Sequence, residues 1–213
     1  LDAVVRRPSS PFDSWELLAT DRVAGSSHWI TVCLVKGRGD PIAAAETRVE
    51  QWIGLVGAEP RSFVPIDDAF VVPNGASRTQ GTAVLVTPCE PRYADSVATV
   101  TDTKHSVGAT AATGLAFYMA VTDALLSALV AAHARNLVHG SIRATTVRLP
   151  KTDSLQETFA LVAASRQCRL AGPAVGTLPQ GATMAADWRA AEEVLIGLAS
   201  ATPLAHVTAR CMS

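Results

Sequence analysis

The chain has 213 residues, with 18 Lys and Arg against 19 Asp and Glu, so its formal net charge is -1. This length is sufficient for one substantial core, or for two lobes that share a core. The near-neutral charge argues against nucleic acid as the main partner, because binding to phosphates requires a basic surface. We expect no transmembrane span, since no run of eighteen apolar residues is free of charge, and LDAVVRRPSSPF at the start lacks the apolar core of a signal peptide.

The first half of the chain has the pattern of a small, strand-rich unit. Residues 15–36 predict strands, because HWITVCLVK is rich in β-branched and aromatic residues. Residues 41–56 predict a helix, with Pro41 in its first turn and apolar residues at three- and four-residue spacing. Residues 62–72 and 82–87 predict further strands, which the polar stretch PNGASRTQG connects.

Helical patterns dominate the second half. Residues 115–135 carry the strongest apolar stripe in the chain, and residues 185–200 form a second helical pattern. Residues 94–113 are weakly patterned and fit a short helix with a loop. Residues 145–149 and 158–163 predict two short strands on either side of a polar turn.

The long helix runs into a segment that resembles the catalytic loop of protein kinases. Residues 128–149 read ALVAAHARNLVHGSIRATTVRL. Kinases carry H-R-D-L-x-x-x-N in this loop, where the Asp orients the substrate hydroxyl and the Asn binds a metal ion. His139 leads the loop here, Ser141 replaces the Asp, and Thr146 replaces the Asn. Arg143 takes the position of a lysine that is common in Ser/Thr kinases.

A second segment, MAADWRAAEEVLIGLAS, is similar to the kinase helix D-x-W-x-x-G-x-x-L-x-E-L. Asp187 and Trp188 match its first two conserved positions, although the Trp directly follows the Asp. The resemblance implies that Asp187 is structural and hydrogen-bonds the loop backbone at His139. The alternative interpretation is a carboxylate that the helix dipole favours in the first turn.

Together, the two segments and the order of elements resemble the protein kinase fold over most of the chain. The resemblance implies an α+β, reduced bilobal kinase-like fold, with a single pseudokinase domain over residues 1–213. Its small lobe is β-rich, contains one helix and covers about residues 1–88. Its large lobe is helical and truncated, and covers about residues 89–213.

The same resemblance locates the parts that bind Mg-ATP in a kinase. The segment LLATDRVAGSSHWITV aligns with the Gly-rich loop of kinases, and Gly25 is its one glycine. Because one flexible residue cannot easily form the same phosphate cradle, an ordinary hairpin turn is favoured there over a phosphate site. Lys36 is the candidate for the ATP-binding lysine, with Glu46 or Glu50 as partner; the alternative is a solvated surface charge. Ala163 lies opposite the metal-binding D-F-G. We therefore expect no catalysis, no cofactor and no metal site.

Four cysteines are present: Cys33, Cys89, Cys168 and Cys211. They contain no C-x-x-C, which argues against a zinc site, and they allow three pairings. Under the kinase resemblance, Cys33–Cys89 falls in the small lobe and Cys168–Cys211 in the large lobe. Each disulfide would contribute about 2–4 kcal/mol. The alternative is four buried free thiols.

Two other kinds of site find little support. Ser141 lies beside His139, but HGS lacks the G-x-S-x-G turn that presents a nucleophilic serine. The five histidines are scattered, with no H-x-x-x-H pair to suggest a metal site.

A compact kinase fold that lacks the Gly-rich loop is similar to the secreted rhoptry-type kinases of apicomplexan parasites. The chain most resembles their with-no-Gly-loop (WNG) family, to which the bradyzoite pseudokinase belongs. This implies secretion, a place in the parasitophorous vacuole or cyst wall, and a role as an inactive scaffold or regulatory module. Its partners would be vacuolar or cyst-wall proteins, or an active kinase that it regulates.

Two alternatives stay open at this stage. One is an atypical kinase that binds nucleotide in a noncanonical way through Lys36 and a carboxylate elsewhere in the chain. The other is a small α/β enzyme unrelated to kinases, against which the lack of a convergent acid, base and nucleophile argues.

Overall fold

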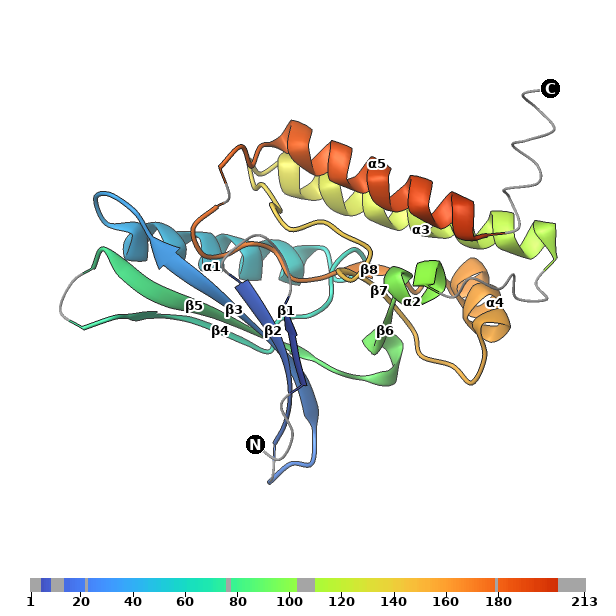
Figure 1. Ribbon diagram of the computed structural model, residues 1–213, viewed down its shortest axis with the longest axis horizontal. Helices are drawn as coiled ribbons and strands as arrows, with labels where there is room; N and C mark the ends of the chain where they lie inside the picture. Colours follow the sequence, from blue (N-terminus) through green and yellow to red (C-terminus); the bar gives the residue numbers. More distant parts are fainter. Residues whose placement is uncertain are drawn as a thin grey trace.

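The computed structural model describes residues 5–8, 14–21, 23–75, 78–102, 110–178 and 180–202. These residues form a small lobe of five strands and one helix, and a large lobe of four α-helices and three short strands (Figure 1). The predicted α+β class and the arrangement in two lobes are confirmed.

The small lobe is an antiparallel sheet with strand order β1-β2-β3-β5-β4. The predicted strands are confirmed, except that the strand expected from residue 62 begins at Asp68. Pairing of β3 with β2 ends at Cys33, so residues 34–36 of β3 extend beyond β2. The strands are β1 (Val5–Pro8), β2 (Ser14–Thr20), β3 (Ser27–Lys36), β4 (Asp68–Pro73) and β5 (Gln80–Pro88).

The region of Gly25 is the hairpin turn between β2 and β3, as the favoured interpretation predicted. The Gly25 N–H donates to the Asp21 carbonyl at 2.9 Å, and Gly25 has φ +67°. The link between the first two strands, where a kinase carries its Gly-rich loop, is residues 9–13. Those residues read SSPFD and lie outside the described part of the chain.

The predicted helix at residues 41–56 is α1 (Pro41–Ala58). It begins where the Asp40 side chain accepts a hydrogen bond from the Ala43 N–H, and Pro41 occupies the first turn, where its missing N–H costs little. Trp52 lies on the buried face with no exposed surface. The helix therefore packs its apolar stripe against the sheet.

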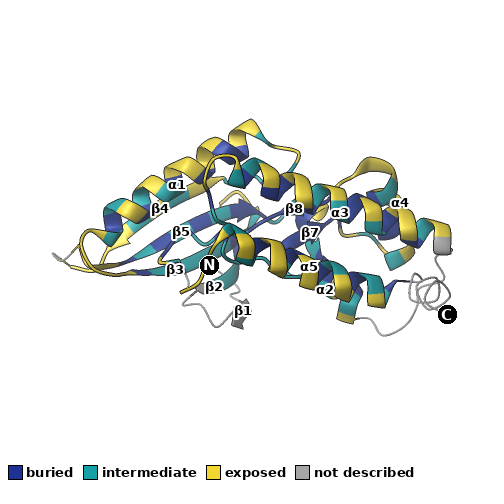
Figure 2. Ribbon diagram, turned by 90° about the horizontal axis from the view of Figure 1, so that it is seen from above, coloured by how far each residue is buried: buried dark blue, intermediate teal, exposed yellow. Residues whose placement is uncertain are grey.

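The large lobe is built on two long helices that lie side by side (Figures 1 and 2). Its helices are α2 (Val97–Asp102), α3 (Ala111–His133), α4 (Leu155–Ser165) and α5 (Met184–Ala201), with a 3-10 turn at Pro91–Tyr93. Its short sheet has the order β6-β7-β8, from β6 (Asp95–Ser96), β7 (Val147–Leu149) and β8 (Arg169–Leu170). The two predicted long helices and the strand at residues 145–149 are confirmed.

The strand predicted at residues 158–163 is wrong, because this segment belongs to helix α4. The Ser154 side chain accepts a hydrogen bond from the Glu157 N–H at 3.2 Å and caps the helix. At the other end, Arg166 ends the helix in a left-handed conformation, with φ +53°. Phe159 and Val162 are buried, so the apolar residues of this segment have helical and not alternating spacing.

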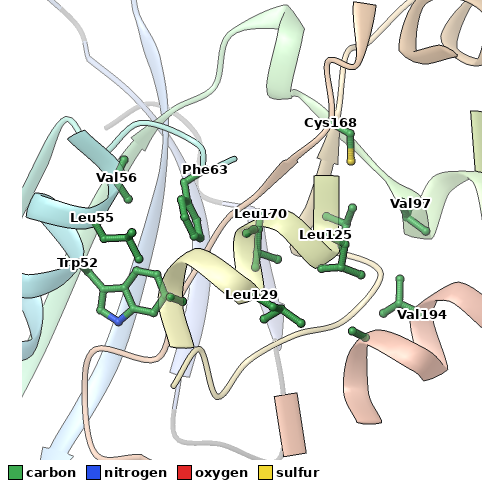
Figure 3. Packing of buried hydrophobic residues seen from close by; sticks show 14 of the residues in the cluster. Trp52, Leu55, Val56, Phe63, Val97, Leu125, Leu129, Cys168, Leu170 and Val194 are labelled. Carbon is green, nitrogen blue, oxygen red and sulfur yellow. The ribbon is translucent and has the colours of Figure 1, made fainter. Parts of the chain in front are cut away.

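One hydrophobic cluster joins the two lobes (Figure 3). Phe63 follows α1 in the small lobe, and it forms a parallel bridge with Leu170 of β8. The Val64 N–H donates to the Leu170 carbonyl, and the Leu170 N–H donates to the Ser62 carbonyl, each at 3.0 Å. The lobes are therefore connected by main-chain hydrogen bonds as well as by side-chain packing.

Helix α3 is long and apolar enough to span a membrane, judged by length and composition, with a mean hydropathy of 1.8 in an 18-residue window of Ala112–His133. The same composition suits a core helix of a soluble protein, and Phe117, Val121, Leu125 and Leu129 of α3 are buried in the cluster. The expectation of no transmembrane span stays a prediction.

Candidate functional site

The loop that resembles the kinase catalytic loop is held by one buried carboxylate. Asp187, in the first turn of α5, accepts hydrogen bonds from the His139 N–H at 2.7 Å and the Gly140 N–H at 2.9 Å. His133, at the end of α3, lies 3.0 Å from the same carboxylate through Nε2. The predicted contact of Asp187 with the loop backbone is confirmed, whereas the sequence did not indicate His133. Trp188 is 38% exposed and packs edge-on against the His133 ring at 5.4 Å.

His139 is fully buried beneath the small-lobe helix. Its ring lies edge-on to Trp52 at 5.7 Å, and Trp52 makes a similar contact with Phe63, also at 5.7 Å. Neither ring nitrogen of His139 has a hydrogen-bond partner within the described residues. Burial lowers the pKa of His139 to about 4, although the nearby Asp187 carboxylate opposes this shift. The histidine is therefore neutral near pH 7 and forms part of the core.

The remaining loop positions hold hydroxyl and guanidinium groups. The Thr146 hydroxyl accepts from the Arg143 N–H at 3.1 Å and donates to the Arg143 carbonyl at 2.9 Å, which closes the loop on itself. Arg143 Nη2 donates to the Ser141 hydroxyl at 3.3 Å. Neither a hydroxyl nor a guanidinium can orient a substrate hydroxyl as a carboxylate does, and neither is a ligand that Mg²⁺ prefers.

Ala163 does not lie opposite the D-F-G position, so this assignment is corrected. It lies within α4, whereas the strand that pairs with β7 is β8, four residues after the end of that helix. The residues that follow β8 are Ala171, Gly172 and Pro173. The Ala171 N–H donates to the Thr146 carbonyl at 2.8 Å, which places this segment beside the loop. The corrected position also lacks a carboxylate.

The next residues, 174–177, cross between the lobes, and we name them the interlobe segment. The Ala174 N–H donates to the His139 carbonyl in the large lobe at 2.8 Å, and the Thr177 N–H donates to the Leu34 carbonyl in the small lobe at 2.9 Å. The Thr177 hydroxyl accepts from the Lys36 N–H at 2.7 Å and donates to the Lys36 carbonyl at 2.6 Å. The interlobe segment therefore occupies the edge of β3 beyond the end of β2.

The assignment of Lys36 as the ATP-binding lysine stays a prediction. Lys36 is the exposed last residue of β3, and Glu46, one of its two proposed partners, is paired with Arg78 at 3.1 Å. The side chain that β3 buries beneath the interlobe segment is Cys33. Nearby, Arg48 of α1 donates to the Val175 carbonyl at 3.3 Å and to the Gly176 carbonyl. Cys33 and Arg48 thus lie beside the interlobe segment.

Burial raises the pKa of the Cys33 thiol and lowers the pKa of the Arg48 guanidinium. The thiol is therefore protonated near neutral pH and packs as a small apolar group.

A buried ion pair also joins the lobes. Arg148 of β7 is bonded to Glu16 of β2, and their side chains are 5% and 14% exposed. The Arg148 guanidinium lies over the ring of Trp29 of β3, 4.7 Å from its centroid. Sequence reasoning missed this trio. The available signal was an arginine between the apolar residues of VRL. The structure buries all three of these residues, so the charge of Arg148 needs a partner.

The predicted Cys33–Cys89 disulfide is wrong, and the predicted Cys168–Cys211 pairing falls partly outside the described residues. Cys33, Cys89 and Cys168 are free thiols, and Cys211 lies outside the described residues. The Cys89 N–H donates to the Ser27 carbonyl, whereas Cys33 lies six residues further along β3, about 20 Å away at 3.3 Å per residue. A disulfide requires Cα atoms within about 7 Å. The described cysteines thus fit the alternative of free thiols, with Cys33 and Cys168 buried and Cys89 half-buried. Burial raises the pKa of the Cys168 thiol to about 12.

Within the described ranges, no three His, Cys, Asp or Glu side chains converge as metal ligands. The arrangement described above, with a five-stranded sheet, one packed helix and a loop fixed by the first turn of a large-lobe helix, defines a protein-kinase-like fold.

Solved structures of two PAN3 pseudokinases share this fold. A mutant of the Neurospora crassa PAN3 pseudokinase has a TM-score of 0.56 at 14% identity, over 95% of this chain and 48% of its own length. The Drosophila melanogaster PAN3 pseudokinase has a TM-score of 0.50 at 16% identity, over 84% of this chain and 41% of its own. This chain thus spans less than half the length of either neighbour. No protein-family model and no curated protein matches the chain.

Proposed function

We propose that the protein is a pseudokinase, a kinase-like domain that does not transfer phosphate and that acts as a scaffold or regulatory module for other proteins. The observation that carries this proposal is the set of hydrogen bonds by which the interlobe segment joins the two lobes. The interlobe segment is hydrogen-bonded to both lobes, and the Glu16–Arg148 pair connects β2 with β7. A nucleotide would have to displace groups that are already bonded to one another.

The chemistry of the site points the same way. Phosphoryl transfer depends on positioning and on carboxylates that hold magnesium between the phosphates. Ser141, Thr146 and Ala171 stand at the corresponding places and supply no carboxylate. Arg48, Arg143 and Arg148 carry positive charge near the loop, against the carboxylates of Glu16 and Asp187, which already have partners of their own. An Mg²⁺ ion would be repelled by this excess of positive charge.

An exposed apolar surface on the large lobe supports a role in protein binding. Such side chains, gathered on exposed faces of helices, are typical of interaction sites. On α3 they are Leu115, Met119, Leu126 and Val130, and on α5 they are Trp188 and Ile196, each between 37% and 59% exposed. The partners that we propose are vacuolar or cyst-wall proteins, or an active kinase.

Membership of the with-no-Gly-loop family, and with it secretion into a parasitophorous vacuole or cyst wall, is also part of the proposal. It is supported by the resemblance of the loop at His139 and the helix at Asp187 to kinases, and by the lack of glycine in residues 9–13. Disulfides do not add support for secretion, because Cys33, Cys89 and Cys168 are free thiols. Immunofluorescence of the native protein in its source cells tests the location.

Thermal unfolding with ATP, with and without magnesium or manganese, tests whether the cleft binds nucleotide. A ligand that binds only the folded state raises the Tm by mass action. We expect no shift at millimolar nucleotide, while an active kinase measured in parallel shows one. A saturable, metal-dependent shift would overturn the proposal and favour an atypical kinase. Phosphotransfer assays on the Lys36→Ala variant would then follow.

A further inference from the structure

A polar pocket lies where the turn after α1 meets the large lobe, away from the loop at His139. It has a volume of about 440 Å³ and is lined by the turn after α1, the middle of α3 and the turn between α4 and β8. Three arginines line it: Arg61 from the first of these turns, and Arg166 and Arg169 from the last. Asp123 of α3 is the one carboxylate in the lining, so the pocket carries two more positive than negative charges.

Arg166 already binds an oxyanion of the protein itself. Its Nη1 donates to the Asp123 carboxylate at 3.1 Å, and the two side chains are 74% and 58% exposed. An ion pair with this exposure is weak, because water screens both charges. A ligand with greater negative charge could therefore take the place of Asp123 on the same guanidinium.

The other two arginines differ in how firmly they are held. Arg169 donates to the Pro60 carbonyl and lies over the Tyr93 ring, 5.3 Å from its centroid, so its guanidinium is fixed beside the pocket. Arg61 is exposed and has no hydrogen-bond or ion-pair partner among the described residues. Its five N–H donors are thus available to a ligand.

We propose that this pocket binds a phosphoryl group. Guanidinium forks match the oxygens of a phosphoryl dianion, and three of them around one pocket suit it better than a singly charged carboxylate. The hydroxyls of Ser62, Ser127 and Ser165 line the same pocket and add neutral donors. The phosphoryl group could belong to free phosphate or to a phosphorylated serine of a partner chain. The proposal is independent of the interlobe cleft, which this pocket does not include.

NMR titration of the full chain with inorganic phosphate, and with a short phosphoserine peptide, tests the proposal. We expect saturable shifts of the arginine Nε–Hε signals of Arg61, Arg166 and Arg169, and none with the unphosphorylated peptide. Tighter binding of the phosphoserine peptide than of inorganic phosphate identifies a phosphorylated chain as the source of the group; equal or tighter binding of inorganic phosphate identifies the free anion. Shifts that do not saturate with either probe would overturn the proposal.

Variants separate the pocket from general surface charge. Arg61→Ala should weaken binding about tenfold, the loss expected for one charge-assisted hydrogen bond, with little effect on folding because Arg61 has no described partner. Asp123→Asn should strengthen binding, since it frees Arg166 and removes a negative charge. Arg189→Ala, an exposed arginine of α5 outside the pocket, is the matched control. Equal affinities for Arg61→Ala and Arg189→Ala would contradict the assignment.

Discussion

Asp187 joins three elements through one carboxylate. Its oxygens receive the backbone N–H groups of His139 and Gly140 and contact the His133 ring, so the end of α3, the loop and the start of α5 share one polar centre. Asp187 is 2% exposed, and a buried carboxylate is tolerated only where such donors replace water. The contact therefore fixes the shape of the loop at His139.

Asp187→Asn should therefore destabilise the protein by about 2–4 kcal/mol. The amide keeps one acceptor oxygen but turns its NH₂ group toward a backbone donor, so one N–H loses its partner. Urea unfolding at neutral pH measures the change. Asp153→Asn, at an exposed turn position, is the control and should change the stability by less than about 0.5 kcal/mol. Equal effects of the two substitutions would contradict the role of Asp187.

His139 makes stability depend on pH. Its pKa is about 4 in the folded protein against 6.5 for an ordinary histidine, so the unfolded chain binds a proton more readily. The corresponding stability, about 3 kcal/mol, is fully present above pH 6.5 and is lost as the pH falls toward 4. Urea unfolding from pH 7 to 4 should show this loss in the native protein. In His139→Phe, which keeps the ring beside Trp52, it should be absent, and parallel pH profiles would show that the histidine is not responsible.

At the scale of elements, the interlobe segment depends on a position that only glycine fits. A Cβ atom on Gly176 would lie 2.7 Å from the Cβ of Cys33 and still closer to the Leu34 carbonyl oxygen. Both neighbours belong to β3, so neither can move without disturbing the sheet. The segment can therefore run against β3 only because residue 176 has no side chain.

We expect Gly176→Ala to cost about 1–3 kcal/mol, as overpacking of a buried site does. Amide hydrogen exchange should also show loss of protection at Thr177, whose N–H is bonded to Leu34. Gly54→Ala in α1 is the matched control, because its new Cβ meets no atom within 4 Å and alanine favours a helix by up to about 1 kcal/mol. Retained protection at Thr177 in Gly176→Ala would mean that the segment is held in another way.

The elements differ in how well their sequences predicted them. The helices α1, α3 and α5 have long apolar stripes, and periodicity alone identified them. The segment TFALVA in α4 is short and apolar, and such a run fits a buried strand equally well. The decisive signal was at its start, where Ser154 and Glu157 have the spacing of a capping box. Placing Ala163 opposite D-F-G followed from missing that signal.

At the scale of the molecule, the Glu16–Arg148 pair connects β2 of the small lobe with β7 of the large lobe. Because both side chains are buried, removal of one leaves the other charged and unpaired. Arg148→Met should cost about 3–5 kcal/mol, whereas the double variant Glu16→Gln with Arg148→Met should cost less than the sum of the two single changes. A double-mutant cycle from urea unfolding measures this coupling. Additive effects would show that the two residues do not stabilise each other.

The content of the cleft could be predicted only in part. Ser141 and Thr146 belong to a local motif, so the sequence alone was enough to single them out. The contacts of Arg48 and Arg148 depend on residues more than a hundred positions away, and local patterns carry no information on such pairs. Lys36 was chosen because it is the one lysine in the small lobe, whereas the register of β3 buries Cys33.

The parallel bridge between Phe63 and Leu170 fixes the chain just after α1 to the large lobe. In protein kinases, repositioning of this helix is one way in which activity is controlled. In this protein the residues just after α1 form main-chain hydrogen bonds with β8, and Trp52 of α1 packs against His139. These contacts hold α1 in one position relative to the large lobe. A partner of the kind proposed above would therefore meet a surface whose shape is set before the encounter. Its association would lose little conformational entropy and would be limited by orientation, not by rearrangement.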